Sequence, residues 1–182
     1  MAIREICLLG NPILRKRCRR VGRNIGEDDV RTVDDLRDTL DNFRATHGFG
    51  RGIAAPQIGV NKRIIFVNMN RAVHIYEGGY PLIDPVIVKR SRQTMLLWDD
   101  CFSFSELLVK VRRNVRITVR FRDSEGRMQR LPADGDFSEL LQHEIDHING
   151  VLAIDRAIDL KHVVHRSEWE RQFKAQGGWS AL

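Results

Sequence analysis

Apolar residues recur at three- and four-residue steps between residues 27 and 46, with aspartate and arginine in the intervening positions. The apolar positions are Val30, Val33, Leu36, Leu40 and Phe43. Because an α-helix turns once in about 3.6 residues, these side chains share one face, and we predict an amphipathic helix over 27–46. Gly48 and Gly50 follow directly and favour the end of that helix.

A second helix is predicted over residues 136–149, DFSELLQHEIDHIN. Asp136 and Glu139 have the spacing of a capping box, in which a cap residue and the residue three positions later exchange hydrogen bonds. Gly150 is well placed to end this helix. A last helix is expected from about Lys161 to Phe173.

Short apolar or alternating segments between the helices predict β-strands. They cover residues 63–68, 80–90, 94–98 and 109–122, with a turn at 123–126 and a return strand through Leu131. Pro81 and Pro85 favour an edge strand or an irregular segment for 80–90, because proline cannot donate a hydrogen bond to a sheet. The alternation of apolar and basic residues over 109–122 predicts one half-buried strand with a basic, solvent-facing side.

The order of these elements indicates an α+β fold. We expect mostly antiparallel sheets packed around a central helix, the one predicted over residues 136–149. A chain of 182 residues without repeats or linkers suits a single domain spanning residues 1–182.

Nothing in the chain favours a membrane or a secreted protein. No apolar run approaches the roughly 18 residues that a membrane span needs. The N-terminus lacks the apolar core of a signal peptide, and three irregularly spaced cysteines do not suit a disulfide framework. We therefore expect a cytoplasmic protein.

The chain is basic, with a formal net charge of +6. Much of the excess lies between Arg15 and Arg23 and between Lys110 and Arg122. A basic surface can meet RNA, so the ribosome surface is a candidate partner, although a solvated face explains the same charge without a partner. The chain has no recognisable nucleic-acid-binding motif, and no specific DNA binding is expected.

The second predicted helix carries His143-Glu144-Ile145-Asp146-His147, an H-E-x-x-H pattern. Residues four apart lie on one face of a helix, so both imidazoles can reach one metal ion. Glu144 is then placed to take a proton from a water on that metal. The alternative is a non-catalytic helix with two half-buried histidines and a surface glutamate.

The third ligand is not determined by spacing. Catalytic zinc-like sites usually have three protein ligands. One known pattern places a third histidine where this chain has Ala153, and another uses a downstream glutamate, for which Glu168 is the candidate. Cys101 is the remaining candidate, because a thiolate binds soft or borderline metals strongly. A lone cysteine is also a common buried residue.

Three segments, in order along the chain, resemble the peptide deformylase family. GRGIAAPQIGV at residues 50–60 is similar to the family's G-x-G-x-A-A-P-Q segment, DDCFS at 99–103 to its E-G-C-L-S segment, and QHEIDHING at 142–150 to its Q-H-E-x-D-H-x-x-G segment. LGNPILRKRC near the N-terminus and YPLIDPVI at 80–87 are also similar. The resemblance spans nearly the whole chain and implies one catalytic domain over residues 1–182.

The resemblance implies a hydrolase that removes the formyl group from the N-terminal formyl-methionine of nascent polypeptides. Cys101, His143 and His147 would bind one divalent ion, Fe²⁺ by preference, with Zn²⁺, Ni²⁺ or Co²⁺ as substitutes. Glu144 would move protons between the water and the leaving amine.

Further roles follow from the same resemblance. The side-chain amide of Gln57 and the backbone N–H of Phe102 would stabilise the developing oxyanion. Asp99 stands where the family has glutamate, and we expect it to pair with Arg112. The residues implied to line or approach the substrate are Gly50, Arg51, Gly52, Ile53, Asp99 and Glu139.

Several positions depart from the family pattern. Asp100 replaces the glycine before the cysteine and adds a negative charge there. Arg51 stands where the family has an apolar residue lining the methionine pocket, and Glu139 lies one helical turn before His143. Glu139 therefore has two alternatives, an ion pair with Arg51 at the pocket mouth or the capping box. The family's substrate-positioning arginine has no obvious counterpart, although Lys110 could substitute.

Three functions remain open from the sequence. The first is a deformylase acting on N-formylated peptides. The second keeps the chemistry but acts on a different N-formyl or N-acyl substrate, because Arg51 and Glu139 are charged. The third is a catalytically silent metal-binding or ribosome-binding relative, against which the intact Glu144 and Gln57 argue.

Overall fold

The computed structural model describes residues 2–69 and 79–173. The helices are α1 Glu27–His47, α2 Gly135–Ile148 and α3 Arg166–Phe173. The strands are β1 Gly52–Ala54, β2 Ile64–Val67, β3 Tyr80–Arg90, β4 Thr94–Asp100, β5 Leu107–Asn114, β6 Arg116–Arg122, β7 Met128–Asp134 and β8 Val163–His165. Within the described residues, none of the helices has both the length and the apolar character that crossing a membrane requires.

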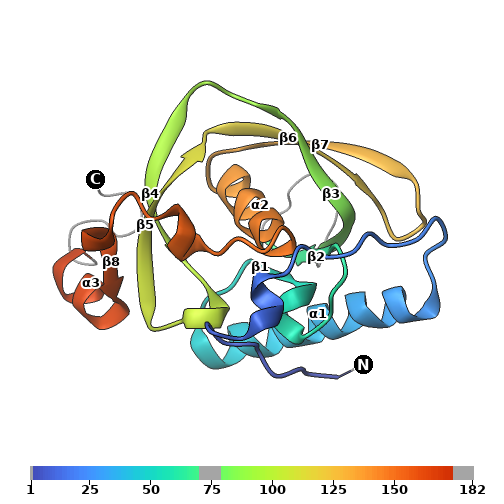
Figure 1. Ribbon diagram of the computed structural model, residues 1–182, viewed down its shortest axis with the longest axis horizontal. Coiled ribbons are helices and arrows are strands. Elements are labelled where there is room, and N and C mark those ends of the chain that lie inside the picture. The colour runs from blue at the N-terminus through green and yellow to red at the C-terminus, as the bar shows by residue number, and fades with distance from the viewer. Residues whose placement is uncertain (1, 70–78, 174–182) are drawn as a thin grey trace.

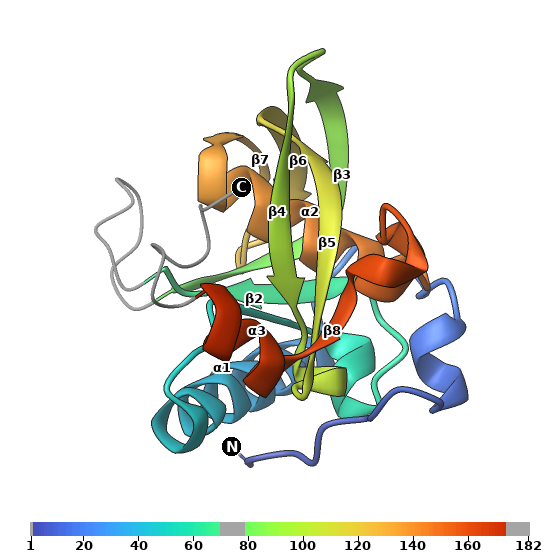
Figure 2. The same cartoon turned by 90° about the vertical axis from the view of Figure 1, so that its left-hand side faces the viewer.

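Two antiparallel sheets form the framework (Figure 1). One has the strand order β1-β2-β3-β6-β7, and the other has the order β4-β5-β8. Helix α2 contacts strands of both sheets. Figure 2 shows β4 and β5 as a long hairpin, with β8 and α3 beside its lower end. The predicted mixture of helices and mostly antiparallel sheets is confirmed.

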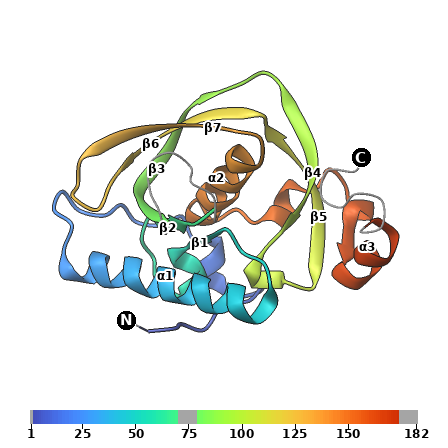
Figure 3. The same ribbon diagram turned by 180° about the vertical axis from the view of Figure 1, so that it is seen from behind.

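Strand β2 is buried on both faces, because its side chains alternate between two helices. Ile64 and Phe66 pack in the cluster that contains apolar residues of α1, whereas Ile65 and Val67 pack with apolar residues of α2. Figure 3 shows α1 running along the side of β1 and β2 that is opposite α2. The five-stranded sheet is therefore enclosed at this end, and β1 is held next to the helix that carries the H-E-x-x-H sequence.

The prediction of one strand over residues 109–122 is wrong. The segment forms β5 and β6, which belong to different sheets and are separated at Val115. The chain leaves one sheet for the other after Asn114, which is bound to α2. Its backbone N–H donates to Gln142 Oε1 at 3.0 Å and its carbonyl accepts from Gln142 Nε2 at 2.9 Å. Burial alternates on both sides of the break without a change of phase, so the sequence pattern could not reveal it.

The prediction of an edge position for residues 80–90 is also wrong, because β3 lies between β2 and β6. The irregularity expected from proline is present inside the strand. A register shift between Ile83 and Val86 contains Pro85, so its missing N–H falls at a bulge, and Asp84 there has a φ of 51°. Pro81 is paired with Phe66.

Two helix predictions need correction. The C-terminal helix begins at Arg166, not near Lys161, because Val163–His165 pairs with β5 as β8. Pairing with a neighbouring strand here overrides local preference. Helix α2 has Asp134 as its N-cap, without a side-chain cap bond, so the predicted Asp136 capping box is wrong. Gly150 does follow the helix end, with a φ of 77°.

Candidate active site

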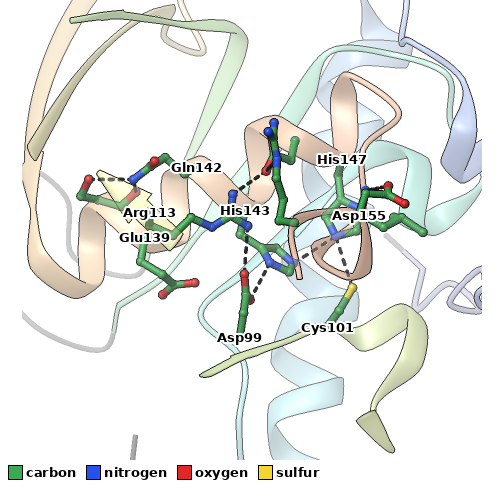
Figure 4. Close-up of polar contacts among 12 residues, drawn as sticks. Asp99, Cys101, Arg113, Glu139, Gln142, His143, His147 and Asp155 are labelled. Atoms are coloured by element: carbon green, nitrogen blue, oxygen red, sulfur yellow. Dashed lines mark hydrogen bonds and ion pairs between the residues drawn. The ribbon is translucent and has the colours of Figure 1, made fainter. Parts of the chain in front are cut away.

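Helix α2 presents the two histidines of the H-E-x-x-H sequence on one face. The Nε2 atoms of His143 and His147 lie 3.1 Å apart. Cys101, between β4 and the 3-10 turn Phe102–Phe104, places its Sγ 3.3 Å from His147 Nε2. All three residues are buried, and their ligand atoms lie within 4.8 Å of one another. In Figure 4, the Cys101 side chain, just after β4, points toward the imidazoles of His143 and His147 on α2.

This donor set suits a divalent transition metal. One sulfur and two imidazole nitrogens are the ligand types that bind zinc and related ions, and three protein ligands leave a further position for water or substrate. Glu168, the alternative third ligand, lies on α3 with its Oε1 3.1 Å from Arg171 Nη2, and its side chain is half exposed. The structure brings Cys101, and not Glu168, to the two histidines.

A carboxylate lies behind the first histidine. Asp99 Oδ1 is 2.8 Å from His143 Nδ1, and Asp99 Oδ2 accepts a hydrogen bond from Arg113 Nη2 at 2.9 Å (Figure 4). The predicted partner Arg112 is wrong, because its side chain is exposed and its Nη1 donates to Thr94 Oγ1. Adjacent residues of a strand point to opposite faces, and in β5 it is Arg113 that faces α2.

The charges around the ligands favour a positive group. Burial alone would lower the pKa of His143, but Asp99 and Cys101 outweigh it and raise that pKa well above its usual value. Burial would raise the pKa of Asp99, but His143 and Arg113 outweigh it and lower that pKa. Burial raises the pKa of the Cys101 thiol, and burial with the charge of His143 lowers the pKa of His147 well below its usual value. The negative charge of Asp99 thus favours a positive charge at His143, on the side of the cluster that faces this carboxylate.

Glu144 lies on the wall of a cavity of about 830 Å³ that also reaches Cys101 and His143. Burial raises the pKa of Glu144 to about 7; the negative charges of Asp99 and Glu139 add to this effect and the charge of His143 opposes it. Glu144 Oε2 is buried and has no hydrogen-bond partner among the described residues. An acidic group with a free oxygen therefore borders the cavity next to the ligand cluster.

Gln57 is held with its amide NH₂ toward the cysteine. Its Oε1 accepts a hydrogen bond from Ala54 N at 2.9 Å, which leaves Nε2 3.7 Å from Cys101 Sγ and 3.5 Å from Ser103 Oγ. Phe102 begins a 3-10 turn, and the first N–H groups of such a turn have no partner within it. Both predicted oxyanion donors therefore lie beside the ligand cluster.

The N-terminal segment is hydrogen-bonded to Gln57 and to Ser103, the residue after Phe102, a feature that sequence reasoning missed. Cys7 N donates to the Gln57 carbonyl at 2.7 Å, and Leu9 N donates to the Ser103 carbonyl at 2.8 Å. Backbone hydrogen bonds do not depend on side-chain identity, so the segment carried no signal for this contact.

Gly50 and Gly52 allow the backbone of this segment to lie close to neighbouring side chains of the site. A Cβ on Gly52 would lie 2.8 Å from Glu144 Oε1, and a Cβ on Gly50 would lie 2.7 Å from Phe102 Cζ. Gly50 also has a φ of 129°, which side chains rarely adopt. The side chain of Ile53 is fully buried in the α1 cluster, so any approach of this residue to substrate would be through its backbone.

Arg51 and Glu139 form an ion pair on the cavity wall. Arg51 Nη2 lies 2.6 Å from Glu139 Oε2, and Arg51 Nη1 reaches the Asp136 carbonyl at 3.4 Å. Of the two alternatives for Glu139, the structure has the ion pair. Helix α2 begins one residue earlier than predicted, so Asp136 lies inside the first turn and is not available as the cap.

Asp100 has a partner that the sequence did not indicate. Its Oδ2 lies 3.0 Å from Arg166 Nη2, the Arg166 Nε donates to the Ser105 carbonyl at 2.6 Å, and the guanidinium packs 4.3 Å from the Phe49 ring centroid. Lys110, expected as a substitute cation, instead lies over the Trp98 ring at 5.6 Å. Arg166 therefore neutralises Asp100 and ties α3 to the rim of the cavity.

Comparisons with known proteins identify the family of this chain. A family model described as Polypeptide deformylase matches residues 3–163. The peptide deformylase of Thermotoga neapolitana is 32% identical over 162 residues, covering 89% of this chain and 92% of the relative. That of Rhizobium meliloti is 34% identical over 179 residues, covering 97% and 98%.

Solved structures give the same result. The crystal structure of Thermotoga maritima peptide deformylase matches with a TM-score of 0.76 at 30% identity, covering 87% of this chain and 100% of that chain. The Synechococcus elongatus peptide deformylase, crystallised in complex with actinonin, matches with a TM-score of 0.76 at 30% identity, covering 89% and 86%. This chain belongs to the polypeptide deformylase family.

Proposed function

We propose that this protein is a metal-dependent hydrolase that removes the N-terminal formyl group from nascent polypeptides. The observation that carries the proposal is the convergence of Cys101, His143 and His147 beside the buried Glu144, in a chain of the polypeptide deformylase family. A cavity of about 830 Å³ at this position offers room for the end of a peptide.

The three ligands would hold one divalent cation, with Fe²⁺ as the native ion and Zn²⁺, Ni²⁺ or Co²⁺ as substitutes. When bound, such a cation polarises water and the formyl carbonyl. Asp99 would orient His143 through the contact at 2.8 Å, and Arg113 would keep that carboxylate in place.

Glu144 would carry the proton. Its free Oε2 accepts a proton from the attacking water and returns it to the amine nitrogen as the carbon–nitrogen bond breaks. The products are formate and a peptide with a free amino terminus. Because Glu144 is buried, the proton stays within the site between the two transfers.

Two donors would stabilise the negative charge that develops on the formyl oxygen. They are the Nε2 of Gln57 and the backbone N–H of Phe102, and the hydrogen bond from Ala54 N to Gln57 Oε1 fixes the amide before the reaction starts. Donors that are oriented in advance lower the barrier because they need no reorganisation, and one such donor contributes about 3 kcal/mol.

The remaining proposals concern the chain as a whole. We propose that residues 1–182 act as one catalytic domain arranged around α2 as the central helix, and that the protein works in the cytoplasm. Contacts of α2 with both sheets support the first point. The ribosome surface remains a candidate partner because of the net charge of +6.

The test is formate release by protein purified without oxygen and loaded with Fe²⁺ or Ni²⁺. We expect release from formyl-Met-Ala-Ser or a matching formyl peptide, and a loss of about 100-fold or more in Glu144→Ala. Glu168→Ala is the matched control, because Glu168 is an exposed glutamate on α3. No release from any formyl peptide by the metal-loaded protein would contradict the proposal.

A further inference from the structure

One side of the cavity is lined by charged groups directly beside Glu144. Arg51, Glu139 and Glu144 all border this space, and the Arg51–Glu139 pair has an N–O distance of 2.6 Å. The Glu139 side chain is almost fully buried at 6% exposure, whereas Arg51 keeps 39%. Arg51, which lines the cavity, therefore keeps exposed surface, whereas its partner is fixed in the wall.

The position of this pair relates it to one part of the substrate. In a formylated peptide, the Cβ of the first residue is only three bonds from the formyl carbon. The first side chain must then occupy the part of the cavity nearest Glu144. Arg51 immediately precedes Gly52, where an added Cβ would lie 2.8 Å from Glu144 Oε1, and Glu139 lies one helical turn before His143. The ion pair thus borders the space that the first side chain enters.

Within residues 2–69 and 79–173, the partners of the Arg51 guanidinium use only part of its hydrogen-bonding capacity. Arginine carries five N–H donors, and the structure shows Arg51 using Nη2 toward Glu139 and Nη1 toward the Asp136 carbonyl. A side chain with an acceptor oxygen can use the remaining donors. An apolar side chain at the same place covers these donors without replacing the water they lose, which costs binding energy.

The surrounding charges disfavour an anionic side chain. Glu139 already offsets the charge of Arg51, Arg166 offsets that of Asp100, and Glu144 borders the same cavity. A carboxylate on the first residue would therefore gain little from Arg51 and would lie near the acidic group of Glu144. A neutral side chain that is about as long as methionine and carries a hydrogen-bond acceptor avoids both the loss of hydrogen bonds to Arg51 and the repulsion between like charges.

We propose that Arg51 and Glu139 make this enzyme selective for formyl peptides whose first side chain is neutral and carries a hydrogen-bond acceptor, such as glutamine or methionine sulfoxide. The inference rests on the proposed deformylase function. It names Arg51 as the residue that contacts the first side chain and Glu139 as the residue that positions Arg51.

The test compares four peptides of equal length on the metal-loaded protein: formyl-Met, formyl-norleucine, formyl-Gln and formyl-methionine-sulfoxide, each followed by Ala-Ser. We expect kcat/KM for the two acceptor peptides to equal or exceed that for the two apolar ones. In Arg51→Met/Glu139→Leu the ratio of acceptor to apolar peptides should fall by about 10-fold, the value of one hydrogen bond to a charged group. Arg51→Leu/Glu139→Gln, which removes the donors of Arg51 and keeps a polar group at position 139, provides a second variant if the first does not fold, and the same fall is expected.

Two further arms separate this inference from the proposed function. Arg120→Met removes an exposed arginine of β6 as the matched control and should leave the ratio unchanged. Isothermal titration of the same peptides into metal-loaded Glu144→Ala measures binding without turnover. The inference would be overturned if the parent protein preferred methionine and norleucine and the double variants showed the same preference. Formate release in that experiment would still support the proposed function. If no peptide is hydrolysed, the function fails, and the titration still decides whether acceptor side chains bind more tightly.

Discussion

Asp99 lies directly behind His143, with its Oδ1 2.8 Å from the Nδ1 of the imidazole. The carboxylate is held on its other side by Arg113, so it can fix the ring with Nε2 turned toward Cys101 and His147. A carboxylate in this position orients a ligand histidine and increases its basicity. We expect Asp99→Asn to weaken metal affinity by about 10- to 100-fold, measured by competition with a chromophoric zinc chelator.

Asp134→Asn serves as the control for this experiment, because Asp134 is an exposed aspartate at the end of β7. Its metal affinity should match that of the parent protein. Equal affinities in the parent and in Asp99→Asn would show that Asp99 does not support His143.

Gln57 provides a prediction about rate as distinct from binding. Its amide is oriented by Ala54 N and lies beside Cys101, where it would meet the formyl oxygen only as negative charge develops. Gln57→Leu should therefore lower kcat by about 100-fold or more with little change in KM. Metal content should be unchanged, and Gln93→Leu, at an exposed position before β4, is the control. A change confined to KM would assign Gln57 to substrate binding only.

The parts of the site that could be predicted from sequence depend on contacts within one element. His143 and His147 share a helix face because of four-residue spacing, and Gly150 ends that helix in the expected place. Spacing left Cys101 and Glu168 as alternatives for the third ligand, and only the family resemblance favoured the cysteine.

Contacts between distant elements were harder to predict. Arg112 and Arg113 are neighbours of the same type, and only the pairing of β5 decides which one faces Asp99. Asp100 and Arg166 are 66 residues apart, with no pattern linking them. The Arg51–Glu139 pair was predicted as one of two alternatives, because both residues are charged at positions where the family pattern is apolar. Such a departure is visible in the sequence without knowledge of the fold.

A substitution at Gly52 tests whether catalysis requires the close approach of β1 to α2. A Cβ at this position would lie 2.8 Å from Glu144 Oε1 and 3.0 Å from Leu140 Cδ1, and both neighbours are buried. Gly52→Ala should displace Glu144 and lower kcat/KM by about 100-fold, because small misplacements of a catalytic group are costly. Overpacking should also lower the free energy of unfolding by about 1–3 kcal/mol.

Gly22→Ala is the matched control for Gly52→Ala. A Cβ on Gly22 would have Asn24 O as its nearest neighbour, at 4.0 Å, so activity and stability should stay close to those of the parent. Full activity in Gly52→Ala would mean that Glu144 has freedom to move and that the close approach is not needed for catalysis.

Asp123 gives a prediction about stability and pH at a position remote from the ligands. Its carboxylate accepts hydrogen bonds from the backbone of Glu125 and Arg127, and from the side chains of Arg127 and Gln129. Burial alone would raise the pKa of Asp123, but the hydrogen bonds from Gln129 and Arg127 outweigh it and lower that pKa. The folded protein therefore holds the charged form more strongly than the unfolded chain does.

A lowered pKa in the folded state contributes stability above the unfolded value, about 3.9 for aspartate, and this contribution is lost as pH falls through the folded value. At pH 7 we expect Asp123→Asn to lower the free energy of unfolding by about 1–2 kcal/mol, since hydrogen bonds to a charged group are lost. The difference from the parent should shrink as pH falls below about 4, where the parent carboxylate also becomes protonated. Urea unfolding of the metal-free proteins from pH 7 to pH 3 measures it, with Asp28→Asn, an aspartate 80% exposed, as control. A difference that stays constant over this range would show that the charge of Asp123 does not carry the stabilisation.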